Sequence, residues 1–137
     1  MSVGLLIITH GDIGRSLLDT AVVVMGSCPL QTETLGIPMA SDPDQQLQRA
    51  QQQLQQLEQG DGVLILTDLY GSTPSNIACK LCNDKVTVVT GLNLPMLIRV
   101  LNYPNLKLQE LADKAVGGGR EGVIGYRQER QHDSASD

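Results

Sequence analysis

His10 is the residue of this chain best placed to do chemistry. The apolar run at 3–9 predicts a buried parallel strand, and 11–14 predicts the opening of a helix, so His10 lies at the carboxyl end of that strand. Ligands of open α/β sheets gather at this edge. An imidazole there can act as a nucleophile and accept a phosphoryl group, while helix N-termini supply amide donors for phosphate oxygens. From its position alone, His10 could equally be an ordinary surface histidine in a turn.

A second candidate site follows another predicted strand, over 68–76. Asp68 can orient an imidazole by accepting its ring N–H. Gly71 permits an unusual turn, and Ser72 and Thr73 precede a proline suited to the first turn of a helix. Amides at that helix start, assisted by the two hydroxyls, could hold phosphate oxygens. Alone, these residues could merely cap turns. The first and third strands of a doubly wound sheet are often neighbours, which would bring this segment to the histidine.

Strand-like and helix-like segments alternate along the chain. Strands are predicted over 3–9, 32–37, 62–68 and 86–90, and helices over about 14–25, 43–59 and 73–82. The strands at 62–68 and 86–90 are apolar or β-branched, which is typical of buried parallel strands. The fold class predicted is therefore α/β, with a doubly wound, mainly parallel sheet and helices on both faces.

Composition narrows the class of protein. The 137 residues suit one domain, and no apolar run approaches the ~20 residues of a membrane helix. A net charge of −5 argues against nucleic acid and anionic membranes as partners. The N-terminus has no basic region or cleavage site of a secretory signal, so cytoplasmic localisation is expected.

Two other classes of function compete with a phosphate carrier. Cys79 and Cys82 form a Cys-x-x-Cys, which could be a redox pair or half of a zinc site, but no second pair exists. Because both fall inside a predicted helix, packed thiols are favoured. In a receiver-type signalling domain Asp68 would itself accept phosphate, which requires a divalent cation held by further carboxylates. Asp12 is the only carboxylate near the end of the first strand, so the sequence does not favour a receiver-type cation site.

The segments at 9–11, 68–76, 91–97 and 119–123 resemble, in this order, the IIA component of the mannose family of the bacterial sugar phosphotransferase system. The likeness spans about 3–124 and implies a phosphotransferase. No cofactor or metal is expected, because phosphohistidine transfer needs positioning and amide donors more than a Lewis acid. It implies that His10 takes phosphate from the phosphocarrier protein HPr and passes it to a IIB domain. It also implies that Asp68 pairs with the imidazole and leaves Nε2 free. The resembled family often has two glycines and a serine before the proline, and that serine binds phosphate. This chain has Gly71-Ser72-Thr73 there, so Thr73 takes the position of the serine.

The resembled family adds an antiparallel C-terminal strand that two subunits exchange. The strand-like run at 122–126 follows the glycines at 117–119, which could act as a hinge and swing it outward, so a homodimer is expected. The domain is expected to cover 1–127, followed by a disordered polar tail over 128–137 that contains His132. The chain ends before a fused IIB domain would begin, which predicts a free-standing carrier whose acceptor could be a regulatory protein. A IIA-like subunit of a dihydroxyacetone kinase is the alternative that stays open.

Overall fold

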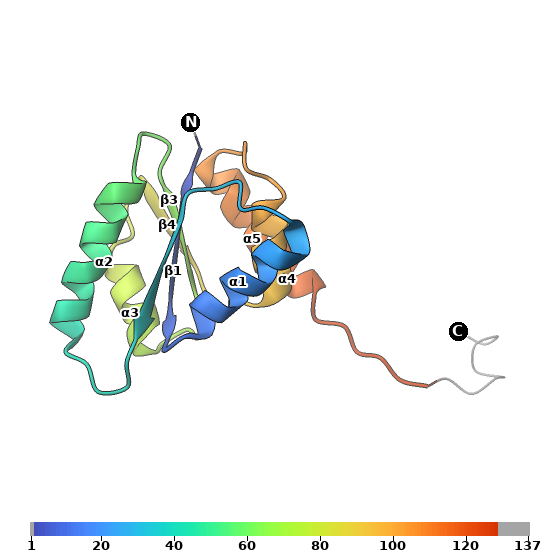
Figure 1. The fold of residues 1–137 in the computed structure, drawn as a ribbon, viewed down its shortest axis with the longest axis horizontal. Coiled ribbons are helices and arrows are strands. Elements are labelled where there is room, and N and C mark those ends of the chain that lie inside the picture. The colour runs from blue at the N-terminus through green and yellow to red at the C-terminus, as the bar shows by residue number, and fades with distance from the viewer. Residues whose placement is uncertain (1, 129–137) are drawn as a thin grey trace.

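A four-stranded sheet with helices on both faces forms the body of the protein in a computed structural model, which describes residues 2–128 (Figure 1). The strand order is β2-β1-β3-β4, and all neighbouring strands are parallel. This confirms the predicted α/β class. In chain order the elements are β1 (Gly4–His10), α1 (Ile13–Met25), β2 (Thr32–Ile37), α2 (Pro43–Leu57), β3 (Val63–Thr67), α3 (Thr73–Lys80), β4 (Val86–Val89), α4 (Leu94–Leu101) and α5 (Leu108–Glu121).

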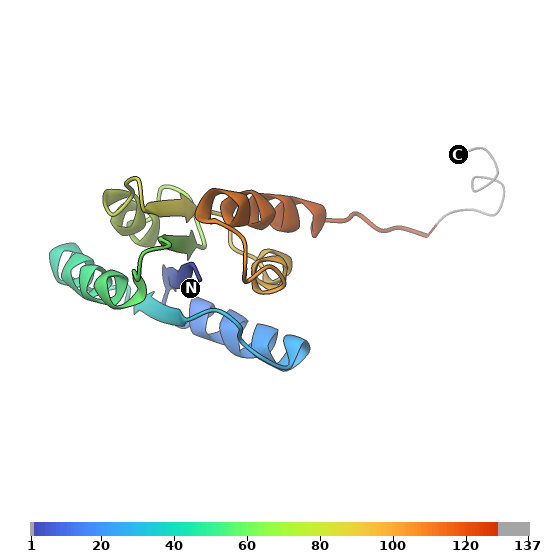
Figure 2. The same cartoon turned by 90° about the horizontal axis from the view of Figure 1, so that it is seen from above.

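Two aliphatic cores flank the sheet, one on each face. Alternate residues of β1 serve them in turn: Leu5 and Ile7 join the core beneath α1, α4 and α5, while Leu6 and Ile8 join the core beneath α2 and α3. Figure 2 shows these two groups of helices on opposite sides of the strands. All four of these β1 side chains are fully buried, which explains why the strand is apolar without interruption.

The parallel register brings distant segments to one edge of the sheet. Ile8 pairs with Thr67 in β3, and His10 pairs with Ile37 in β2. The carboxyl end of β1, the residues after β3 and the loop after β2 therefore meet at the same edge. The predicted juxtaposition of His10 with the 68–76 segment follows from this register.

Helices α4 and α5 were not predicted, and the glycines at 117–119 lie inside α5 instead of forming a hinge. The reason is close packing between the two helices. A Cβ at Gly118 would lie 2.5 Å from the Cβ of Arg99, and one at Gly119 would lie 2.8 Å from the Cε of Met96. Glycine is needed here because the backbone of α5 rests directly on α4.

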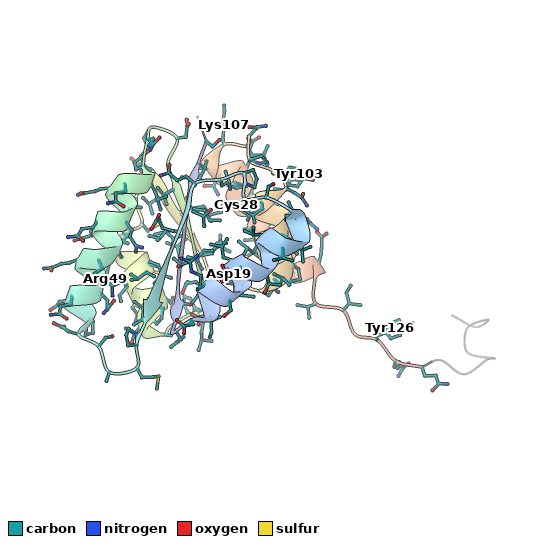
Figure 3. The ribbon with its side chains drawn as sticks, viewed as in Figure 1. Asp19, Cys28, Arg49, Tyr103, Lys107 and Tyr126 are labelled. Carbon is teal, nitrogen blue, oxygen red and sulfur yellow. The ribbon has the colours of Figure 1, made fainter. Side chains whose placement is uncertain are left out.

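The segment after α5 runs away from the body as an extended, exposed stretch (Figure 3). Val123, Ile124 and Tyr126 expose 76%, 77% and 98% of their surface. Within residues 2–128 of the single chain, this segment is not paired with any strand, so the expected antiparallel strand stays a prediction. His132 and the rest of 129–137 lie outside the described residues. No helix in the described part of the chain has the length and apolar character needed to cross a bilayer.

The prediction of packed thiols was wrong. Cys79 and Cys82 are both exposed, as is Cys28. Helix α3 turns Ile77 and Ala78 toward the sheet and leaves Cys79 exposed in its last turn. Cys82 lies beyond the end of the helix at Lys80, not inside it as predicted.

Candidate active site

An imidazole and a carboxylate form the centre of the candidate site. The Nδ1 of His10 lies 2.8 Å from the Oδ2 of Asp68, and the backbone N–H of His10 donates to the same oxygen at 3.1 Å. The other carboxylate oxygen, Oδ1, accepts from the Leu69 N–H at 3.1 Å. The side chain of His10 is 37% exposed and that of Asp68 is 12% exposed. A carboxylate that already accepts two N–H groups favours a donor at Nδ1, so Nε2 keeps its lone pair in the neutral ring.

His10 lines a pocket of about 280 Å³ at the carboxyl edge of the sheet. One wall comes from the end of β2 and the loop that follows it, and the other comes from the first turn of α3. The lining residues are His10, Ile37, Pro38, Met39, Ser41, Pro43, Thr73 and Pro74. The pocket therefore places the imidazole beside a helix N-terminus, where the aligned peptide dipoles favour an anion.

The start of α3 has the geometry predicted from its sequence. Gly71 has a φ of +83°, a backbone conformation that favours glycine, and its N–H donates to the buried Ser75 hydroxyl at 3.3 Å. Asn76 N–H donates to the carbonyl of Ser72 at 2.8 Å, so the amide of Thr73 lies ahead of the helical ladder. Thr73 is the first residue of the helix and lines the pocket beside His10.

The predicted part of the Ser72 hydroxyl in holding phosphate stays a prediction. That hydroxyl donates to the carbonyl of Leu69 at 2.6 Å and closes the turn after Asp68. The structure thus joins His10 to Asp68 by hydrogen bonds and to Thr73 through the pocket. Gly71 and Ser72 shape the turn between these groups.

The loop after β2 is the part of the site that sequence reasoning missed. Pro38, Met39 and Ser41 form a wall of the pocket, and the Ser41 hydroxyl donates to the carbonyl of Pro38 at 3.0 Å. The loop follows a strand that neighbours β1 in the same parallel sheet. Ligands of such sheets gather at the carboxyl ends of parallel strands. This expectation pointed to His10, and it could also have pointed to the loop after β2.

Comparison with known proteins decides the family. The EIIA-man profile, described as "PTS system fructose IIA component", matches residues 4–116. The chain belongs to the EIIA-man family. It is 33% identical over 131 residues to the "PTS system mannose-specific EIIAB component" of Escherichia coli K12, covering 90% of this chain and 39% of that protein. It is 27% identical over 114 residues to the "PTS system fructose-specific EIIA component" of Bacillus subtilis, covering 80% and 76%.

Solved structures of phosphotransferase-system IIA proteins share the fold. The mannose/sorbose-specific IIA subunit from Enterococcus faecalis superposes with a TM-score of 0.85 at 23% identity, over 95% of this chain and 98% of that one. The PTS IIA protein associated with the fucose utilization operon of Streptococcus pneumoniae gives a TM-score of 0.76 at 26% identity, over 91% and 96%. The EIIA-man chain spans about two fifths of the length of the E. coli relatives that it matches.

Proposed function

We propose that this EIIA-man chain is a phosphocarrier of a sugar phosphotransferase system, with Nε2 of His10 as the phosphate acceptor. The observation that carries the proposal is the 2.8 Å contact between Nδ1 of His10 and Oδ2 of Asp68. It commits one ring nitrogen to the carboxylate and leaves the lone pair of the other for attack. Family membership and the pocket beside the helix N-terminus support the same role.

The proposed transfer exchanges one N–P bond for another. The Nε2 lone pair of His10 attacks the phosphorus of a phosphohistidine on the donor, and the donor imidazole leaves with the electron pair of its broken N–P bond. The His10 ring gains positive charge, which the carboxylate of Asp68 stabilises. The amide and hydroxyl of Thr73 donate to phosphate oxygens at the start of α3.

HPr is the proposed donor, and a IIB domain or a regulatory protein is the proposed acceptor, with all of them in the cytoplasm. The matched profile and the named relatives are sugar phosphotransferase components, and this favours a sugar system over a dihydroxyacetone kinase subunit. The proposed partner face surrounds the pocket, because donor and acceptor histidines must approach within bonding distance of Nε2.

Labelling with phosphoenolpyruvate, enzyme I and HPr tests this function. The wild-type chain should take up phosphate in an acid-labile, base-stable form. His10→Ala should abolish the label, while His132→Ala, the matched histidine variant, should keep it. Acid-stable, base-labile phosphate on Asp68, or labelling that survives His10→Ala, would overturn the phosphohistidine assignment and favour the receiver-like alternative.

We also propose that the chain forms a homodimer through its C-terminal segment. Val123, Ile124 and Tyr126 are exposed apolar residues, and β4 is an edge strand of the described sheet. An unpaired edge offers backbone groups to a strand from a second copy. Because α5 ends at Glu121, truncation after Gly122 removes the segment and keeps the helix. This truncation should give a monomer in sedimentation, and truncation after Arg127 should leave the dimer. A monomeric wild type, or a shorter chain that still dimerises, would contradict the proposal.

A further inference from the structure

Thr9 makes two hydrogen bonds next to the proposed phosphate acceptor. Its side chain is buried, with 1% of the residue exposed. Its Oγ1 accepts the N–H of Gly14 at 2.8 Å and donates to the carbonyl oxygen of His10 at 3.2 Å. Asp12, the N-cap residue of α1, makes no capping hydrogen bond with its own side chain. The Thr9 hydroxyl therefore supplies the cap from the end of β1.

The contact between Thr9 and α1 is close-packed. A Cβ on Gly14 would lie 2.7 Å from Cγ2 of Ile7 and 3.1 Å from Oγ1 of Thr9. The first turn of α1 thus rests on the side chains of β1. On the other side of the turn, the N–H of Gly11 donates to the carbonyl of Ile37 at 2.9 Å. The short connection between β1 and α1 is held by both neighbours.

Two groups fix the backbone on either side of the imidazole. The carboxylate of Asp68 binds the N–H of His10, which belongs to the peptide before the ring. The Thr9 hydroxyl binds the carbonyl of His10, which belongs to the peptide after it. One oxygen of Asp68 accepts both the backbone N–H and Nδ1, so both contacts form only when the backbone and the ring adopt one mutual orientation.

We propose that Thr9 is a positioning residue for phosphotransfer, whose hydroxyl holds the His10 backbone so that Nδ1 stays on Asp68 and Nε2 faces the pocket. The inference rests on the proposed function of His10. Thr9 itself touches neither the phosphate nor a partner, because it is buried beneath the turn.

Thr67 provides a matched control. It precedes Asp68 as Thr9 precedes His10, and its exposure is 0%. Its Oγ1 has no hydrogen-bond partner among residues 2–128. Thr9→Val and Thr67→Val thus make the same exchange of hydroxyl for methyl at two buried strand ends, but only the first breaks hydrogen bonds.

Two measurements test the positioning role. ¹⁵N NMR of the imidazole in unphosphorylated protein reports which ring nitrogen carries the proton. Thr9→Val should weaken the preference for protonated Nδ1 and lower kcat for transfer from phospho-HPr about five- to tenfold, since one hydrogen bond contributes about 1 kcal/mol. KM should not change. Thr9→Ser should restore both readouts, and Thr67→Val should match the wild type in both.

Wild-type NMR and kinetics in a folded Thr9→Val protein would overturn the inference. So would a Thr9→Ser variant as impaired as Thr9→Val, since the methyl group and not the hydroxyl would then be responsible. If Thr9→Val does not fold, Thr9→Cys replaces it, because a thiol is a weak hydrogen-bonding group. The NMR readout needs no phosphate donor. Failure of the wild type to be labelled would therefore contradict the proposed function, while a change in the protonated nitrogen would still establish positioning.

Discussion

Asp68→Asn keeps the shape of the side chain and removes half of its acceptor capacity. The carboxylate accepts three N–H groups: His10 Nδ1 at 2.8 Å, His10 N at 3.1 Å and Leu69 N at 3.1 Å. Asparagine has one acceptor oxygen, so in either orientation its NH₂ group faces at least one N–H. When NH₂ faces His10, the ring should present an unprotonated Nδ1 to it and carry its proton on Nε2. The nucleophilic lone pair is then lost from the pocket.

The size of the effect follows from the hydrogen bond that is lost. A hydrogen bond to a charged group contributes roughly 1.5–3 kcal/mol, which corresponds to roughly a 10- to 150-fold change in the reactive population and in the rate of phosphorylation. The fold should survive, because Asp68 follows the carboxyl end of β3 and is not part of either core.

Single-turnover transfer from phospho-HPr measures the rate, and ¹⁵N NMR of the imidazole measures the protonated nitrogen. Asp12→Asn is the matched control, because Asp12 is an exposed carboxylate two residues after His10. It should transfer phosphate at the wild-type rate. If Asp68→Asn also transfers at that rate, the carboxylate does not orient the ring and serves only to cap the turn at Leu69.

Three further changes should give distinct results. Thr67→Val should raise the free energy of unfolding by about 1 kcal/mol in urea denaturation, because it removes a buried hydroxyl without a protein partner; a loss of stability would show that the hydroxyl is bonded. The N–H of Gly60, and then that of Gly62, donate to Glu58 and lower its pKa. The stability that Glu58 adds over Glu58→Gln should therefore be full at neutral pH and disappear as the pH falls through the lowered pKa; a difference independent of pH would contradict this assignment. Thr73→Val should slow phosphorylation about tenfold and Thr73→Ser should not, whereas equal rates in all three proteins would leave only the amide of Thr73 in the phosphate site.

Local pattern predicted the strands and the position of the candidate site. The apolar runs around β1 and β3 can be satisfied only by burial on both faces of a sheet, and the turn residues after them predicted strand ends. Where pattern was ambiguous, the predictions failed. The glycines in α5 have the composition of a turn, but contact with Arg99 and Met96 places them in a helix. Cys79 and Cys82 fit a buried helix by their neighbours, yet Cys79 is exposed on α3 and Cys82 is exposed beyond the end of that helix.

The sequence by itself determined the α/β class and the nomination of His10, Asp68 and Thr73, because strand burial and helix starts depend on residues adjacent in the chain. Only the tertiary structure decided what these residues can do together. Strand register placed Nδ1 of His10 on Asp68. It also added the loop after β2 to the pocket. Hydrogen-bond geometry depends on a few tenths of an ångström between segments as many as 58 residues apart, and no local pattern encodes such a distance.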